Sequence, residues 1–380
     1  MTDFIVKSGL QISGGSKLKS GTIAGNATLD LTSGNFFSHT PTADTTFVFN
    51  NPPASGKVDG FALKITGVDI GSSYDLANAS YDNVSFSVSG QDTTPQDLFF
   101  KPDGAKMYVL GNTGNDVNEY TLSTAWDITT ASYVQNFGVA SQETAPAGLF
   151  FKPDGTKMYV VGDSSNAVNE YTLSSAWDIS SASYVQSFSV STQETDPTDV
   201  FFKPDGTKMY VAGDSANAVN EYSLSTAWDI STSSYDQSFN ISSQTTKPEG
   251  LFFKPDGTKM YVITGTSEDI DEYSLSTAWD ISTASYIRNV SVSAASNPSG
   301  LFFKPDGTKM YVIYINSLAV LQYSTGTIDI ATFTYPASVD WPTNGVPPIA
   351  PAVGETDVLT FYTGDGGTTY NGFQAGDAMQ

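Results

Sequence analysis

Cysteine is absent from this chain of 380 residues, so neither disulfides nor thiolate metal sites can form. Basic residues are few: 17 lysines and arginines stand against 40 aspartates and glutamates, a net charge of −23 that should repel nucleic acid and anionic lipid. The sequence has no apolar run of about 18 residues and no charged-then-apolar leader after Met1, so we expect neither membrane insertion nor a signal peptide. No segment keeps a helical apolar period, so we expect almost no helix.

One phrase, in forms such as LFFKPDGTKMYV, recurs five times along the chain. Its aspartates are Asp103, Asp154, Asp205, Asp256 and Asp306. Successive copies are therefore 51, 51, 51 and 50 residues apart. A fixed period of this length, with strand-forming residues in every copy, predicts a β-propeller or a β-solenoid.

Each period contains four strand-like runs, which we call A to D. In the third copy they are Val200–Lys203, Lys208–Ala212, Ala218–Leu224 and Tyr235–Ser242. The runs are rich in valine, tyrosine and phenylalanine, and clusters of glycine, proline, aspartate and serine separate them. This pattern of short apolar runs separated by turn-forming residues is typical of strands and turns.

The number of strand copies decides between a closed ring and an open stack. Strand D occurs five times, but its first copy, residues 81–89, precedes the first A strand, and the last A-B-C unit has no D strand after it. One blade built from both ends of the repeat region would remove the exposed strand edges of a solenoid. We therefore predict a five-bladed β-propeller over residues 71–327, with its last blade closed by residues 81–89.

The two flanks, residues 1–70 and 328–380, carry strand-like runs of their own, among them Ala27–Ser33, Thr45–Asn51 and Gly60–Gly67. Neither flank alone has enough strands for a two-layer core, whereas together they supply roughly six to eight. The predicted fold class is all-β: a five-bladed propeller inserted into a split, jelly-roll-like β-sandwich that serves for docking. The GDGG segment, residues 364–367, reads as a hairpin turn because no helix-forming stretch follows it.

The conspicuous repeated residues have structural explanations. The Pro-Asp-Gly segment consists of residues that are common in β-turns, so it needs no catalytic or calcium-binding role. The tryptophan of each AWDI segment should pack a loop onto its neighbour, with its aspartate capping the backbone, although a sugar-stacking platform is the alternative. In each Asn-Glu-Tyr segment the tyrosine should be core, and the glutamate should be solvated or paired with the lysine of KMYV.

Catalysis is not expected. The single histidine, His39, lies in a flank, so no Ser-His-Asp arrangement can form within the repeats. Near-identical repeats should also place the same residue five times around the axis, instead of the mixed constellation that an enzyme needs. A carboxylate pair for glycoside cleavage stays open, since acids are plentiful, but nothing in the sequence singles out a pair.

The flanking phrases FIVKSGLQIS, GNATLDLTSGNFF, TTFVFNNPPASG, GFALKITG and YPASVDWPTNGVPPIAP, with DVLTFYTGDGGTTYNGFQAG, carry a resemblance. They are similar to the β-rich domain of virion structural proteins of marine tailed phages of the cyanophage and pelagiphage type. In those relatives the LKIT-like strand usually runs directly into a WPxxVxWP-like segment, whereas here the propeller fills the run between Thr66 and Ala331. The KPDGTKMYV phrase also resembles YVTN and lactonase-like propeller repeats.

The resemblance implies a phage virion surface structural protein, a capsid decoration or a tail or head fibre, made in the host cytoplasm. Its sandwich would dock onto other virion proteins as a homo-oligomer, with a trimer favoured, and its propeller would be displayed outward for adhesion to the host surface or to glycans. A purely structural cement or fibre protein is the alternative. A glycan-degrading enzyme is the third hypothesis.

The topology indicates a binding face. The chain enters the propeller before a D strand and leaves it after a C strand, so both connections should lie on the side of the C-D loops. The D-A and B-C loops on the opposite side are polar and are the most divergent parts of the repeats. Short polar side chains suit hydroxyl-rich ligands, and neighbouring carboxylates could hold Ca²⁺; no other cofactor is expected. Solvated loop tips are the alternative. The candidate ligand-binding residues are Glu143, Asp163, Asn166, Glu194, Asp214, Asn217 and Glu268.

Overall fold

The computed structural model describes residues 23–24, 27–40, 45–52, 54, 59–66, 73–326, 333–342, 347–348, 350–351 and 355–379. The chain divides into two compact units, one of residues 73–326 and one of residues 1–72 together with 327–380. As expected, the described parts are nearly all β, and their helices are five single 3-10 turns: η1 (Leu76–Asn78), η2 (Ile128–Thr130), η3 (Ile179–Ser181), η4 (Ile230–Thr232) and η5 (Ile281–Thr283). None of these helices is long and apolar enough to cross a membrane.

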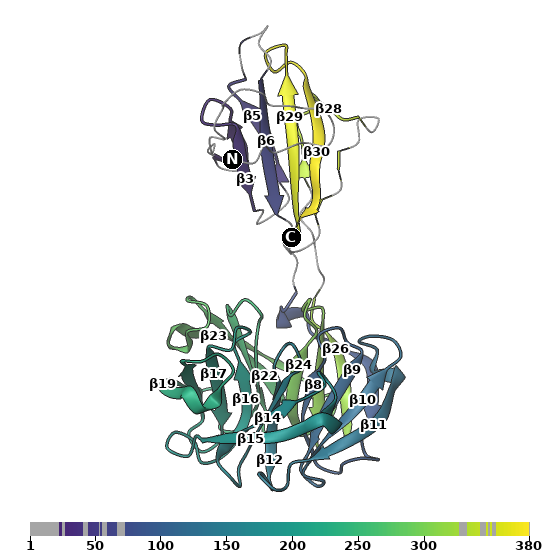
Figure 1. Ribbon diagram of the computed structural model, residues 1–380, viewed down its shortest axis with the longest axis vertical. Coiled ribbons are helices and arrows are strands. Elements are labelled where there is room, and N and C mark those ends of the chain that lie inside the picture. Colours follow the sequence, from purple (N-terminus) through teal and green to yellow (C-terminus); the bar gives the residue numbers. More distant parts are fainter. Residues whose placement is uncertain are drawn as a thin grey trace. The chain divides into compact units, whose positions relative to one another are not determined.

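Residues 73–326 form five blades of four antiparallel strands each, which confirms the predicted five-bladed propeller (Figure 1). The inner A strands are β8 (Pro95–Phe100), β12 (Pro146–Phe151), β16 (Pro197–Phe202), β20 (Pro248–Phe253) and β24 (Pro298–Phe303). The B strands are β9 (Lys106–Gly111), β13 (Lys157–Gly162), β17 (Lys208–Gly213), β21 (Lys259–Thr264) and β25 (Lys309–Tyr314). The C strands are β10 (Asp116–Leu122), β14 (Ala167–Leu173), β18 (Ala218–Leu224), β22 (Asp269–Leu275) and β26 (Ala319–Ser324). The outer D strands are β11 (Ala131–Gly138), β15 (Ala182–Ser189), β19 (Ser233–Asn240), β23 (Ala284–Ser291) and β7 (Ser80–Ser87).

The fifth blade joins the two ends of the repeat region. Its outer strand β7 precedes every other blade strand in the sequence, yet it pairs antiparallel with β26, with Tyr81 opposite Tyr323. Phe86 on β7 also packs edge-to-face on Tyr120 of the first blade, with ring centroids 5.5 Å apart. The ring is therefore held shut both by backbone pairing and by aromatic packing across the first and fifth blades.

The chain enters and leaves the propeller on one side, which we call the tether face and which carries the A-B turns and C-D loops. Tyr74 N–H at the start and Thr325 Oγ1 near the end both donate to the same carbonyl, that of Gly307 in the last A-B turn, at 2.9 and 2.7 Å. The far face, on the opposite side, carries the D-A and B-C loops.

Each C-D loop fastens one blade to the next. The Trp177 ring lies so close to Gly155 of its own A-B turn that a Cβ there would be only 2.4 Å away, and the Trp177 carbonyl accepts a hydrogen bond of 2.7 Å from Tyr108 of the preceding blade. Asp178 caps η3. This confirms the packing and capping interpretation of the AWDI segment. The same inter-blade bond recurs from Tyr159 to Trp228, Tyr210 to Trp279, Tyr261 to Tyr74 and Tyr311 to Trp126.

The repeated glutamates are buried and pair with the lysine of KMYV, the second of the two states expected for them. Glu119 is 1% exposed and lies 2.6 Å from Lys106 Nζ. Alternation along a strand places every second side chain in solvent only when one face of the sheet is exposed to solvent. A propeller blade is packed between two neighbouring blades, so both of its faces are buried.

The second unit draws strands from both flanks. Its largest sheet has the order β28-β30-β29-β6-β3, and β6, from before the propeller, pairs antiparallel with β29, from after it. The strands of this sheet are β3 (Phe36–His39), β6 (Asp59–Thr66), β28 (Val339–Asp340), β29 (Thr356–Thr363) and β30 (Tyr370–Met379). Smaller sheets contain β1 (Ile23–Ala24), β2 (Thr28–Asp30) and β5 (Val48–Asn50), and β4 (Thr45–Thr46) with β27 (Phe333–Thr334).

The sheets of this unit share one aromatic core. Phe61 stacks on Phe361 with ring centroids 4.9 Å apart, and Phe49 packs edge-to-face on both. The GDGG segment is the hairpin turn between β29 and β30, with Gly366 and Gly367 at positive φ, as expected. The split, jelly-roll-like sandwich stays a prediction.

Candidate functional site

The inner strands bring their third residues together around the propeller axis. These residues are Asp97, Gly148, Asp199, Gly250 and Gly300. A Cβ on Gly148 or Gly300 would lie 2.6 or 2.3 Å from the carboxylate oxygen of Asp199 or Asp97, so this layer has no room for a further side chain. The expectation of one residue type repeated five times around the axis is therefore wrong here, because adjacent side chains would overlap at so small a radius.

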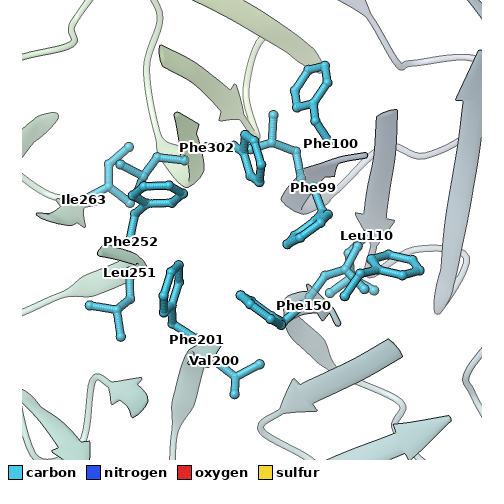
Figure 2. Packing of buried hydrophobic residues seen from close by; sticks show 14 of the residues in the cluster. Phe99, Phe100, Leu110, Phe150, Val200, Phe201, Leu251, Phe252, Ile263 and Phe302 are labelled. Carbon is cyan, nitrogen blue, oxygen red and sulfur yellow. The ribbon is translucent and has the colours of Figure 1, made fainter. Parts of the chain in front are cut away.

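A layer of phenylalanines fills the axis beside these residues. Its members point toward one another around the centre and form a closed ring (Figure 2). They are Phe99, Phe150, Phe201, Phe252 and Phe302, and each meets the next near edge-to-face, with centroids 5.0 to 5.7 Å apart. This is the favoured geometry for aromatic pairs. The cavity left between this ring and the two aspartates has a volume of about 20 Å³, room for roughly one water molecule.

Asp97 and Asp199 form a buried carboxyl pair in which one side chain hydrogen-bonds to the other. Each carboxyl also accepts two backbone N–H groups, one from the following residue and one from the next blade. The donors are Leu98 and Leu149 for Asp97, and Val200 and Leu251 for Asp199, at 2.6 to 2.7 Å. Burial raises the pKa of Asp97 to about 7 and raises the pKa of Asp199 well above its usual range, where the charge of Asp97 adds to the effect.

This pair makes stability depend on pH, and substitution of Asp199 should show it. A carboxyl with a raised pKa binds a proton more tightly in the folded than in the unfolded chain, so its contribution to stability falls as pH rises above about 4. We expect the melting temperature of the wild type to fall more steeply between about pH 5 and about pH 8 than that of Asp199→Asn. The amide of this variant can still donate to Asp97 but cannot ionise.

Thermal melts of both proteins across this range provide the measurement. Other buried acids contribute equally to both curves, so the difference between the slopes isolates the axial pair. Parallel curves would show that the two carboxyls do not share a proton.

The axial pair does not have the geometry for glycoside hydrolysis. Retaining and inverting glycosidases separate their two carboxyl groups by about 5–5.5 and 6.5–9.5 Å to accommodate the sugar or a water. Asp97 and Asp199 are in hydrogen-bond contact, and the cavity beside them holds no more than about one water.

On the far face, two of the predicted ligand-binding residues have internal partners. Glu143 and Glu194 are each 1% exposed. Glu143 accepts hydrogen bonds from Ala145 N–H at 2.8 Å and from the hydroxyl of Ser165 at 2.6 Å, so it ties the D-A loop to the B-C loop of its blade. Glu194 bonds in the same way, including to Ser215.

The other predicted residues lie at the tips of the B-C loops. Asp163 is exposed, and Asp214 and Glu268 are half-buried. Asn166 and Asn217 adopt left-handed backbone conformations with φ of 49°, as asparagine tolerates in turns. The Asn166 amide is placed to donate to the backbone carbonyls of Asp163 and Thr195. The ligand-binding role of all seven residues stays a prediction.

Electrostatics link some of these loops to one another. Burial, followed by the charges of Asp163 and Asp214, raises the pKa of Asp196. Burial likewise raises the pKa of Glu249; the ion pair with Lys247 opposes this shift, and the charges of Asp214 and Asp196 add to it. The far face of the second to fourth blades therefore carries an acidic patch, which we define as Asp163, Asp196, Asp214 and Glu249. In the described parts of the chain, no group of three or more acidic, histidine or cysteine side chains is arranged to hold a metal ion.

Sequence reasoning missed two members of this patch and both axial aspartates. Asp196 and Glu249 flank the proline that opens an inner strand, at positions where no other repeat carries an acid, and this variation was the available signal. The axial pair had a similar signal in the alternation of Asp and Gly before the Leu-Phe-Phe segment.

No known protein family matches the chain, and no curated protein matches it either. Several solved structures do. A Bacteroides uniformis protein to which 6-phosphogluconolactonase activity is ascribed is 13% identical, with 60% of this chain and 67% of that chain covered and a TM-score of 0.40. Hydrazine synthase of Kuenenia stuttgartiensis is 18% identical, with 72% and 64% covered and a TM-score of 0.39. A Lactobacillus plantarum protein is 13% identical, with 63% and 72% covered and a TM-score of 0.41. Lactonase-like proteins are thus among its structural neighbours, and likenesses this distant assign no activity.

Proposed function

We propose that this protein is a non-catalytic structural protein of a phage virion surface, a capsid decoration or a tail or head fibre. Its propeller presents the far face to the host surface, where it binds glycans. The virion assignment is supported by the resemblance of the flanking sequences. The binding mode is supported by the propeller geometry.

The observation that carries the binding mode is the filled axis. In this propeller the phenylalanine ring and the axial carboxyl pair fill the centre and leave a cavity of about 20 Å³. A ligand of sugar size needs a pocket of roughly 300 Å³ or an open surface. Binding on the loops of the propeller is then the remaining mode.

The two faces of the propeller differ in what they can offer. The loops of the tether face are occupied by the inter-blade tryptophans and by the two chain connections at Gly307. The far face offers exposed hydroxyl, amide and carboxylate groups on short loops between rigid strands, together with the acidic patch. Such groups suit polyhydroxylated ligands.

The second unit provides the docking part of the proposal. Its jelly-roll-like sandwich would bind other virion proteins and would associate with copies of itself, with a trimer favoured, because closed symmetric oligomers are common among surface proteins of particles. Sedimentation of the purified full chain tests this association.

Neutralising the acidic patch should weaken glycan binding. The double variant Asp163→Asn, Asp214→Asn should bind its best glycan at least roughly tenfold more weakly, because each hydrogen bond to a charged group contributes about 1.5–3 kcal/mol and each asparagine keeps part of it. Its melting temperature should stay within about 2 °C of the wild type, since both residues are at loop tips. A glycan array with the purified full chain identifies the ligand, and titration of both proteins measures the change.

Asp236→Asn is the matched control, since Asp236 carries the same charge on the outer strand β19, away from the far face. Unchanged binding by the double variant would refute this choice of face. An array without any bound glycan would favour the cement or fibre alternative, and turnover of a bound polysaccharide would favour the enzyme hypothesis.

A further inference from the structure

The fourth blade differs from the others in carrying buried aspartates at two alternate positions of its C strand, in addition to the repeated glutamate. Asp269 and Asp271 on β22 are 9% and 2% exposed. Side chains two residues apart on a strand point to the same side. The basic residues nearby are engaged elsewhere, because Lys259 and Arg288 pair with Glu272.

The equivalent residue in the first blade shows what Asp271 lacks. There, Asn118 donates its amide N–H to Asp116 Oδ1 at 2.7 Å. The second and third blades also have asparagine at this position, Asn169 and Asn220. A carboxylate at position 271 has no N–H to donate, and Asp271 Oδ2 is buried without a hydrogen-bond partner. A buried, unpaired carboxylate is costly unless a counter-charge neutralises it.

A second buried oxygen on the same strand is unpartnered. The Tyr273 hydroxyl has no hydrogen-bond partner, whereas the equivalent Tyr120 donates to Gln91 at 3.2 Å in the first blade. Burial, with smaller contributions from the charges of Asp271 and Asp269, raises the pKa of Tyr273. The Tyr273 hydroxyl and Asp271 Oδ2 are thus two buried oxygens of strand β22 without a hydrogen-bond partner.

Two further oxygens surround Asp269. Thr264 and Ser267 stand where the first blade has Gly111 and Gly114, and their hydroxyls both lie 2.7 Å from Asp269 Oδ1. The cluster therefore consists of carboxylate and hydroxyl oxygens drawn from β21, β22 and the exposed loop between them. Asn289 contributes its N–H group to Asp269 Oδ2 and orients that carboxylate from outside the cluster.

We propose that Asp269 and Asp271 bind a hard cation, Ca²⁺, between the B-C loop and strand β22 of the fourth blade. Carboxylate and hydroxyl oxygens are the ligands that Ca²⁺ takes, and it tolerates irregular geometry with water completing the shell. The Thr264 and Ser267 hydroxyls, which contact Asp269, would serve as neutral ligands, and the unpartnered Tyr273 hydroxyl is the further candidate on the same strand. The ion supplies the positive charge that the Asn118 N–H group supplies, in part, to Asp116 in the first blade. This site is independent of the proposed glycan binding.

Calcium titration of the full chain tests the proposal. After removal of metals with a chelator, CaCl₂ should bind at about one ion per chain and raise the melting temperature, because a ligand that binds only the folded state stabilises it. Tb³⁺, which occupies calcium sites, should show luminescence excited through nearby aromatic rings. Asp271→Asn should bind at least roughly tenfold more weakly, the loss expected when one charged ligand of about 1.4 kcal/mol or more is removed.

The control variants separate a lost ligand from a lost fold. Asp271→Asn copies the residue of the first three blades, so without metal it should melt at or above the wild-type temperature. Asp116→Asn, at the equivalent of Asp269 in the first blade, should leave the calcium response unchanged.

Tyr273→Phe should weaken binding severalfold and serves as a second variant should Asp271→Asn not fold. An equal calcium response in the wild type and Asp271→Asn, or stabilisation of the wild type by acid alone without any calcium effect, would overturn the proposal.

Discussion

A propeller that begins at Ser89 instead of Ser73 will not fold cooperatively. The sixteen residues between these two starts contain η1 and β7, and they include the fully buried Leu76 and Val88 as well as Tyr74, which is 4% exposed. Burial of each such side chain contributes about 1.5–3 kcal/mol. The truncation therefore removes roughly 5 kcal/mol or more, comparable with the whole stability of a typical domain. Thermal melting of residues 73–326 and 89–326 measures the difference.

The position of these residues makes the loss larger than burial alone suggests. Tyr74 accepts a hydrogen bond of 2.6 Å from Tyr261 of the fourth blade, its ring lies on Gly307 of the fifth, and Phe86 packs on the first. Three consecutive blades lose contacts at once. Strand β26 is also left with an exposed edge, which favours aggregation.

Rearrangement of the chain provides the control. Attaching residues 73–88 after Gly326 through one inserted threonine gives the fifth blade a C-D loop of the same length as the others. This permuted chain should melt within a few degrees of residues 73–326, since every contact is restored. Failure of the permuted chain, or cooperative melting of residues 89–326 near the temperature of the longer chain, would contradict the closure mechanism.

The strand count predicts the closure of the ring but leaves part of the fifth C-D loop unrecognised. Tyr74-Asp75-Leu76 is the fifth copy of the Trp-Asp-Ile segment: Tyr74 has the same left-handed backbone, with φ of 58°, and Asp75 caps η1. Tyrosine in place of tryptophan and leucine in place of isoleucine hide the match in the sequence. The structure reveals it through this backbone, this cap and the Tyr74 carbonyl, which accepts from Tyr261 as the tryptophan carbonyls do in the other blades.

The axial and inter-blade features depend on geometry that a linear pattern does not contain. The phenylalanine of each inner strand reads as core from the sequence, but the closed ring of five requires the small radius of a five-bladed ring. The same crowding explains why aspartate appears in only two of the five axial positions, in non-adjacent blades. Glu143 and Glu194 look like surface acids in the sequence because their serine partners, Ser165 and Ser215, come from the B-C loop about twenty residues further along the chain.

Removing the lysine of one buried ion pair will destabilise the propeller by about 3–5 kcal/mol, the cost of leaving a buried carboxylate without its partner. Lys157 Nζ lies 2.5 Å from Glu170 Oε1 and also donates to the Trp228 carbonyl of the next blade at 2.8 Å. The Glu170 side chain is only 2% exposed, so water cannot replace the ammonium. Lys157→Met should therefore lower the melting temperature by roughly 10 °C, as measured by calorimetry.

The fifth blade supplies the compensating change. It carries Gln322 where the other blades have glutamate, and there Lys309 pairs with Asp82 instead, at 2.7 Å. A neutral amide is thus compatible with this position. The double variant Lys157→Met, Glu170→Gln should regain most of the lost stability, because Gln186 Nε2, which donates to Glu170 Oε2 at 2.9 Å, can donate equally to an amide oxygen. If the double variant is no more stable than Lys157→Met alone, the loss arises from the inter-blade bond to Trp228 and not from the unpaired charge.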